Sequence, residues 1–134
     1  MTADAVRALA QTRLAQAAET LREAETLTQA ALWRGAINRA YYAMFYAIQA
    51  LAVWRQVSLS KHSGVIAFFD REFIKPGLMA REHSRELHLG FDRRQAADYG
   101  EMLDALPEDA LQAVAEAHSF VAAVADFLRA AGGG

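Results

Sequence analysis

The sequence contains no cysteine, and this absence excludes two classes of small domain. Without thiols, the chain can form neither a disulfide framework nor a thiolate metal site. Its four histidines do not follow a metal-ligand spacing such as HxxxH. The sequence therefore predicts no metal and no other cofactor.

Net charge and long apolar runs are also scarce. A formal charge of −2 gives no general attraction to nucleic acid, so any phosphate contact must come from a local cluster. Charged residues interrupt every hydrophobic segment, and the first residues, MTADAVRALAQ, lack the basic region and apolar stretch of a signal peptide. We therefore expect a soluble, cytoplasmic protein with no membrane partner.

Proline occurs only at positions 76 and 107, no segment alternates like a strand, and alanine is abundant, which together favour helices. The apolar periodicity predicts long helices over about 3–26, 31–56, 79–99 and 107–130, with a short helix after a Ser60 N-cap. Gly100 is expected to end the fourth of these five helices. The expected fold is all-α, an antiparallel four-helix up-down bundle with one additional short helix. It would form a single domain over 1–130, followed by a flexible tail at 131–134.

The helix predicted over 31–56 has little solvent-facing surface. Alanines form one ridge and larger apolar residues form the next, so most of this helix should be core. The exceptions are Asn38, Arg39 and Tyr42, which could line a site.

Three stretches in order, NRAYYAMFYAIQAL (38–51), SKHSGVIAFFDREFIKPG (60–77) and RRQAADYG (93–100), resemble the HEPN domain, and more narrowly its small stand-alone members. The similarity covers roughly Leu21 to Phe127. It implies a dimerising helical bundle that binds nucleotides or acts on RNA. It also implies a minimal nucleotidyltransferase as a toxin–antitoxin partner, which in such pairs can modify a tyrosine; here that would be Tyr99.

Active HEPN ribonucleases carry an arginine, four to six residues, and then a histidine. In this chain Arg94 is followed after four residues by Tyr99, and a phenol with an ordinary pKa of about 10 is a poor base at neutral pH. The catalytic residues are therefore unassigned, with Arg94, Tyr99 and the more N-terminal His88 as candidates. The resemblance and the missing histidine together favour a nucleotide- or RNA-associated binding or interaction module. The alternative is a metal-independent endoribonuclease toxin that uses Arg94 with Tyr99 or His88.

Helical spacing gives Arg94 a second interpretation. Leu87, Phe91, Arg94 and Asp98 share one face, so Arg94 and Asp98 should turn inward and pair. Asn38 or Tyr42 would complete this structural polar network, and loss of a desolvated Asp98 would then destabilise the fold sharply.

A phosphate or nucleotide site is the alternative to that network. Its candidates are Arg39, Arg94, Lys61 and His62, the last two because they lie at a helix N-terminus. His62 could instead bond across its own loop.

The last predicted helix carries two apolar rows, one of them Ala113, Ala117, Phe120, Val124 and Phe127. Since two rows could serve both the chain's own core and a partner, the sequence predicts a homodimer.

Overall fold

A computed structural model describes residues 1–59, 62–99 and 107–133, without the side chains of residues 62, 63 and 133. The described residues form helices and turns and contain no strand. The predicted all-α class is therefore confirmed, while the up-down four-helix order stays a prediction.

Five α-helices and two π-helical turns make up the described chain. They are α1 (Ala3–Gln29), α2 (Trp33–Arg55), α3 (His62–Phe69), η1 (Asp70–Ile74), α4 (Arg81–Asp98), α5 (Pro107–Leu128) and η2 (Arg129–Gly133). The predicted Ser60 cap, Gly100 stop and Lys61 lie outside the described residues. The part of the predicted tail that is described, 131–133, belongs to η2.

The residues that end α1 and α2 are not glycine, and the end of α1 differs from the predicted one. Thr2 caps α1, with its Oγ1 accepting from the Ala5 N–H at 3.1 Å. The helix then continues three residues beyond the predicted Thr26, to Gln29, and Ala31 turns the chain at a φ of 59°. Gln56 ends α2 in the same left-handed conformation, with a φ of 58°. Left-handed termini usually hold glycine, so the sequence carries no signal for these two.

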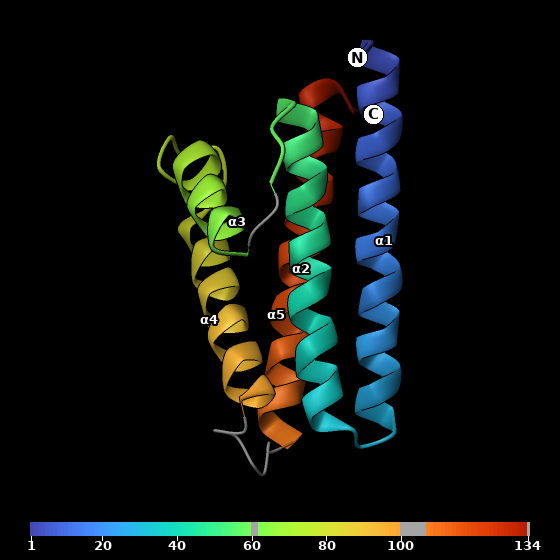
Figure 1. The fold of residues 1–134 in the computed structure, drawn as a ribbon, viewed down its shortest axis with the longest axis vertical. Helices are drawn as coiled ribbons and strands as arrows, with labels where there is room; N and C mark the ends of the chain where they lie inside the picture. Colours follow the sequence, from blue (N-terminus) through green and yellow to red (C-terminus); the bar gives the residue numbers. More distant parts are fainter. Residues whose placement is uncertain (60–61, 100–106, 134) are drawn as a thin grey trace.

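The long helix α2 lies in the middle of the fold. It contacts α1, α4 and α5, and α1 and α4 lie on opposite sides of the α2–α5 pair (Figure 1). The alanine ridge of α2 is fully covered, which allows these neighbours to approach closely. Gly90 of α4 faces this helix, and a Cβ there would overlap the Met44 methyl group. The close approach brings the last turns of α4 against the aromatic residues of α2.

A cluster of aromatic rings joins α3 and η1 to the other helices. The ring of Phe73, on η1, lies 5.7 Å from Phe68, 6.0 Å from Phe69, 6.4 Å from Trp54 and 5.3 Å from Phe127, centroid to centroid. Phe73 itself is completely buried. These contacts fix the short helical segment onto α2 and α5.

Both apolar rows of α5 are used inside this chain. Ala117, Phe120 and Val124 are 0% exposed, and in the other row Val114 is 8% and Val121 7% exposed, whereas Leu111 of that row is 55% exposed. Most of both rows is therefore core, and the homodimer stays a prediction.

In the described chain, one helical stretch, Pro107–Gly132, is long and apolar enough to cross a membrane by length and composition alone. Core helices of soluble proteins meet the same criterion, and the apolar rows of this one are packed against the bundle.

Candidate functional site

Arg94 lies near the end of α4, with its guanidinium against the aromatic face of α2. Its Cζ is 5.1 Å from the ring centroid of Tyr41, 5.9 Å from that of Tyr42 and 5.7 Å from that of Phe91. The side chain is only 14% exposed. Three ring faces therefore hold the cation in place through contacts that are stronger when water is partly excluded.

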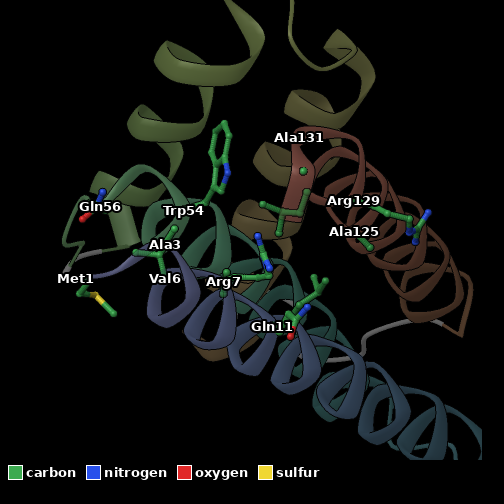
Figure 2. Close-up of a pocket in the computed structure, with 14 residues that line it drawn as sticks. Met1, Ala3, Val6, Arg7, Gln11, Trp54, Gln56, Ala125, Arg129 and Ala131 are labelled. Atoms are coloured by element: carbon green, nitrogen blue, oxygen red, sulfur yellow. The ribbon is translucent and has the colours of Figure 1, made fainter. Parts of the chain in front are cut away.

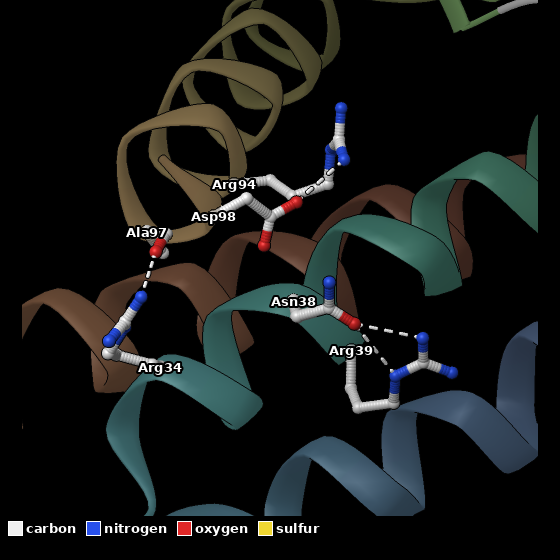
Figure 3. A network of polar contacts seen from close by, with 6 residues as sticks. All are labelled: Arg34, Asn38, Arg39, Arg94, Ala97 and Asp98. Atoms are coloured by element: carbon white, nitrogen blue, oxygen red, sulfur yellow. Dashed lines mark hydrogen bonds and ion pairs between the residues drawn. The ribbon is translucent and has the colours of Figure 1, made fainter. Parts of the chain in front are cut away.

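Asp98, one turn along the helix, is the anionic partner of Arg94. The Arg94 Nη1 donates to the Asp98 Oδ2 at 2.8 Å, which is the pair that the i,i+4 spacing predicts (Figure 3). The Arg94 Nε is buried and has no hydrogen-bond partner among the described residues. Asp98 is 37% exposed, so its carboxylate keeps contact with solvent while the Arg94 side chain is largely covered. Loss of this carboxylate would leave the covered Arg94 charge without its anionic partner, so the sharp destabilisation that the sequence predicts for Asp98→Ala stays a prediction.

Asn38 is not part of the Arg94 pair. Its Oδ1 accepts from the Nε of Arg39 at 3.1 Å and from the Nη2 at 2.9 Å (Figure 3). Arg39 also lies 3.6 Å from the Glu23 carboxylate of α1, and its Cζ is 5.0 Å from the Tyr42 ring centroid. Two guanidiniums, those of Arg39 and Arg94, thus lie against the same tyrosine.

Partly buried rings extend this surface along α2. Phe45 and Tyr46 are neither buried nor fully exposed, and their centroids lie 5.9 and 6.3 Å from that of Tyr42. We define the Arg39–Arg94 surface as Arg39, Tyr42, Phe45, Tyr46 and Arg94. Arginines interleaved with partly accessible rings can bind phosphates and stack on nucleobases.

Arg34 is a residue whose role the sequence did not show. Its guanidinium donates to the backbone carbonyl of Ala97, at the last turn of α4 (Figure 3). A cation at a helix C-terminus satisfies an otherwise unpaired carbonyl and complements the dipole. Arg34 therefore positions the end of α4, and with it Arg94, against α2.

Tyr41 lies beneath the Arg94 guanidinium and is 0% exposed. Burial raises the pKa of Tyr41 from 10.0 to about 12; the Arg94 charge lowers it and the neighbouring Tyr42 raises it by smaller amounts. The phenol is therefore neutral throughout the physiological range. It serves as a neutral ring surface for the cation.

This raised pKa predicts a loss of stability in alkaline solution. The unfolded phenol ionises near pH 10.0 and the folded one near 12, so the stabilisation is complete below pH 10 and falls as the pH rises through this window. The loss should be on the order of 2 kcal/mol. Urea unfolding from pH 8 to 11.5 measures it. Tyr41→Phe should flatten the decline, whereas Tyr99→Phe, which changes a phenol that is 78% exposed, should leave it unchanged.

The histidines whose side chains are described all lie beside carboxylates. His83 Nδ1 is 2.7 Å from Glu86, His118 Nε2 is 3.3 Å from Glu25, and His88 Nε2 is 2.8 Å from Asp70. The last carboxylate also accepts from the Ser84 hydroxyl at 2.7 Å, so His88 helps to join η1 to α4. The His83–Glu86 pair, with side chains 13% and 12% exposed, had no signal in the sequence beyond its i,i+3 spacing.

The candidates from the sequence are thus only partly brought together. Arg39 and Arg94 converge on Tyr42, Tyr99 is 78% exposed at the end of α4, and His88 is bound to another element. Lys61 and the His62 side chain lie outside the described residues. Within the described ranges, no group of three His, Asp or Glu side chains is placed to hold a metal ion.

Comparison with known proteins supplies independent evidence. The family model described as "HEPN domain" matches residues 10–127. A "UPF0332 protein" of Thermotoga maritima is 37% identical over 109 residues, which cover 81% of this chain and 83% of that protein. "Putative toxin MJ0142" of Methanocaldococcus jannaschii is 31% identical over 106 residues, or 79% of this chain and 72% of that protein. A second protein of that organism, "Putative toxin MJ0605", is 35% identical over 83 residues, or 62% of each chain.

Proposed function

The chain belongs to the HEPN domain family, and on this premise we propose that it is a toxin-like module that binds RNA or nucleotides at the Arg39–Arg94 surface. The observation that carries the proposal is the convergence of the Arg39 and Arg94 guanidiniums on the Tyr42 ring, at 5.0 and 5.9 Å. The names of two relatives support the toxin-like part of the proposal.

Phosphate is the ligand group that these two cations suit best. A guanidinium presents several N–H donors in a plane and can bind two phosphate oxygens at once. The carboxylates beside Arg39 and Arg94 are partly exposed, Glu23 at 51% and Asp98 at 37%, so a phosphate can displace them at little cost. Tyr42, Phe45 and Tyr46 would stack on the bases without selecting a sequence.

Binding without cleavage is favoured by where the imidazoles lie. Each histidine side chain within the described residues lies beside a carboxylate, whereas the ionic partner of Arg94 is Asp98. RNA cleavage without a metal needs a side chain that takes up and releases protons near neutral pH. An imidazole can do this, whereas a phenol with an ordinary pKa cannot. The endoribonuclease alternative would have to use the exposed Tyr99, or His88 released from Asp70.

A binding and cleavage assay on one set of samples tests this proposal. Labelled single-stranded RNA and a panel of nucleotides are titrated with the wild type, Arg94→Ala and Arg39→Ala. We expect each substitution to weaken RNA binding about tenfold or more, since each removes charge-assisted hydrogen bonds. Arg85→Ala, which removes an exposed arginine on α4, is the matched control and should change affinity far less.

The RNA should remain intact in these samples. Cleavage by the wild type that is lost in Arg94→Ala would establish the endoribonuclease instead. No binding of RNA or of any nucleotide by the wild type would refute the proposed function.

Two protein partners belong to the same proposal. A second copy of the chain would bring two Arg39–Arg94 surfaces into one assembly. A monomer mass measured by light scattering would contradict this homodimer.

A nucleotidyltransferase is the other partner, and the 78% exposure of Tyr99 supports its hydroxyl as an accessible acceptor. Incubation with such an enzyme and a labelled nucleotide should label the wild type but not Tyr99→Phe.

A further inference from the structure

A large cavity lies at the other end of the bundle from Arg94, where α1 begins and α5 ends. Its volume is about 540 Å³, and its walls come from the first half of α1, the end of α2 and the turn η2 (Figure 2). We call it the end cavity. Pockets that bind small molecules occupy roughly 300 to 1,000 Å³, so this space is large enough for a ligand.

The space exists because small residues face each other there. Ala3 and Ala10 of α1 lie opposite Ala125 of α5 and Ala131 and Gly132 of η2. Gly132 leaves helical geometry with a φ of 87°, and η2 forms part of the cavity wall. The residues that separate the two helices at this end are thus too short to fill the gap between them.

The described wall of the end cavity is largely apolar, and its charged side chains are positive. Val6, Leu14, Trp54 and Leu128 supply the apolar surface. Arg7 and Arg129 are the charged side chains that line it, beside the polar Gln11 and Gln56, and among the described residues no Asp or Glu lines the cavity, although acids outnumber bases in the chain, 16 to 14.

The carboxylates nearest to these two arginines lie outside the lining. Asp4 is 3.8 Å from Arg7 with a side chain 93% exposed, and Asp126 is 2.9 Å from Arg129 and 71% exposed. Such exposed pairs are weak, and one contact occupies few of the N–H donors of a guanidinium. Both guanidiniums therefore have N–H donors left that can bind an anionic group of a ligand.

We propose that the end cavity binds a small amphipathic anion, with its apolar body against Val6, Leu14 and Trp54 and its anionic group at Arg7. This site is separate from the Arg39–Arg94 surface and does not depend on the function proposed there. An aliphatic wall with one indole offers little to a nucleotide, whereas a carboxylate, sulfonate or phosphate on an apolar body matches both the wall and its charge.

Two fluorescent probes with the same rings test this site. The anion 8-anilinonaphthalene-1-sulfonate is compared with N-phenyl-1-naphthylamine, which lacks the sulfonate. We expect one saturable site for the sulfonate and binding at least fivefold weaker for the neutral probe. Arg7→Gln should weaken the sulfonate about fivefold and leave the neutral probe unchanged. The control is Arg22→Gln, on the same helix but outside the end cavity, which should change neither.

The tryptophans locate the bound probe. Trp54 lines the cavity, whereas Trp33 lies at the other end of α2, about 30 Å away by helical rise. Trp33→Phe should keep energy transfer to the bound probe, and Trp54→Phe should remove most of it. If Trp33→Phe removed the energy transfer and Trp54→Phe kept it, the probe would lie elsewhere and the proposal would be overturned.

Substitutions that fill the cavity are the last test of this site. Ala125→Phe should abolish binding of both probes while the circular dichroism spectrum and cooperative unfolding persist. If that variant fails to fold, Ala131→Leu, at an exposed position of η2 that also lines the cavity, replaces it. Unchanged binding in a folded filled variant, or equal affinity for the two probes in the wild type, would refute the amphipathic-anion site.

Discussion

Replacing Phe73 by alanine is expected to lower the free energy of unfolding by about 4 kcal/mol, as removal of a fully buried phenyl ring does. The ring is 0% exposed and contacts aromatic residues of three other elements, α2, α3 and α5. The Arg55 guanidinium also lies over it, with its Cζ 5.2 Å from the centroid. Alanine would leave a cavity at the point where η1 joins the bundle, and urea denaturation measures the loss.

Two further substitutions show whether lost packing causes the destabilisation. Phe73→Leu keeps much of the volume and should cost less than half as much. Leu111→Ala removes an apolar side chain that is 55% exposed, and it should change stability by no more than about 0.5 kcal/mol. A loss in Phe73→Ala as small as that of Leu111→Ala would contradict the burial of the aromatic cluster.

The second large effect is expected at Glu116, which joins α5 to α4. Its carboxylate accepts from the Arg93 guanidinium, and these side chains are only 15% and 17% exposed. Gln112 donates to the other oxygen at 2.9 Å. Glu116→Ala would leave the Arg93 charge largely covered and unpaired, so we expect a cost of about 2 kcal/mol in the free energy of unfolding.

A solvent-exposed pair at the junction of α5 and η2 provides the control. Asp126→Ala removes the partner of Arg129 from a pair whose side chains are 71% and 68% exposed, and it should have little effect. Replacing Arg93 and Glu116 together by Met and Leu should recover most of the loss, because the uncompensated charge is gone. Equal losses in the Glu116 and Asp126 variants would show that burial of the α4–α5 pair is not what matters.

The helices could be predicted because alanine-rich amphipathic periodicity is a local property of the sequence. Pro107 with two acids after it marked the first residue of α5 correctly. The end of α1 was predicted three residues early, since Ala31 and not a glycine adopts the left-handed conformation there, whereas the end of α2 agrees with the predicted Gln56 to one residue. The π-helical turn η1 also had no local signal, because it follows α3 without a break and its Phe73 is fixed by residues distant in the sequence.

The site was predictable to the extent that it lies on one helix. Spacing alone indicated the Arg94–Asp98 pair, which the structure contains at 2.8 Å. The meeting of Arg39 with Arg94 at Tyr42 depends on the rotation of α4 about α2, which no local pattern encodes. The exposure of Asp98 and the packing of most of both apolar rows of α5 within the chain are likewise tertiary, so local spacing could not predict them.

Photo-crosslinking tests most directly whether RNA lies on the Arg39–Arg94 surface. Single-stranded RNA containing 5-bromouridine is irradiated with the wild-type protein, and the crosslinked tryptic peptides are identified by mass spectrometry. The peptide 40–55 contains Tyr42, Phe45 and Tyr46, whereas 86–93 contains His88. We predict crosslinks to residues 42–46 that disappear in Arg94→Ala. Crosslinks confined to 86–93, or to any region that the Arg94 substitution leaves unaffected, would contradict the account.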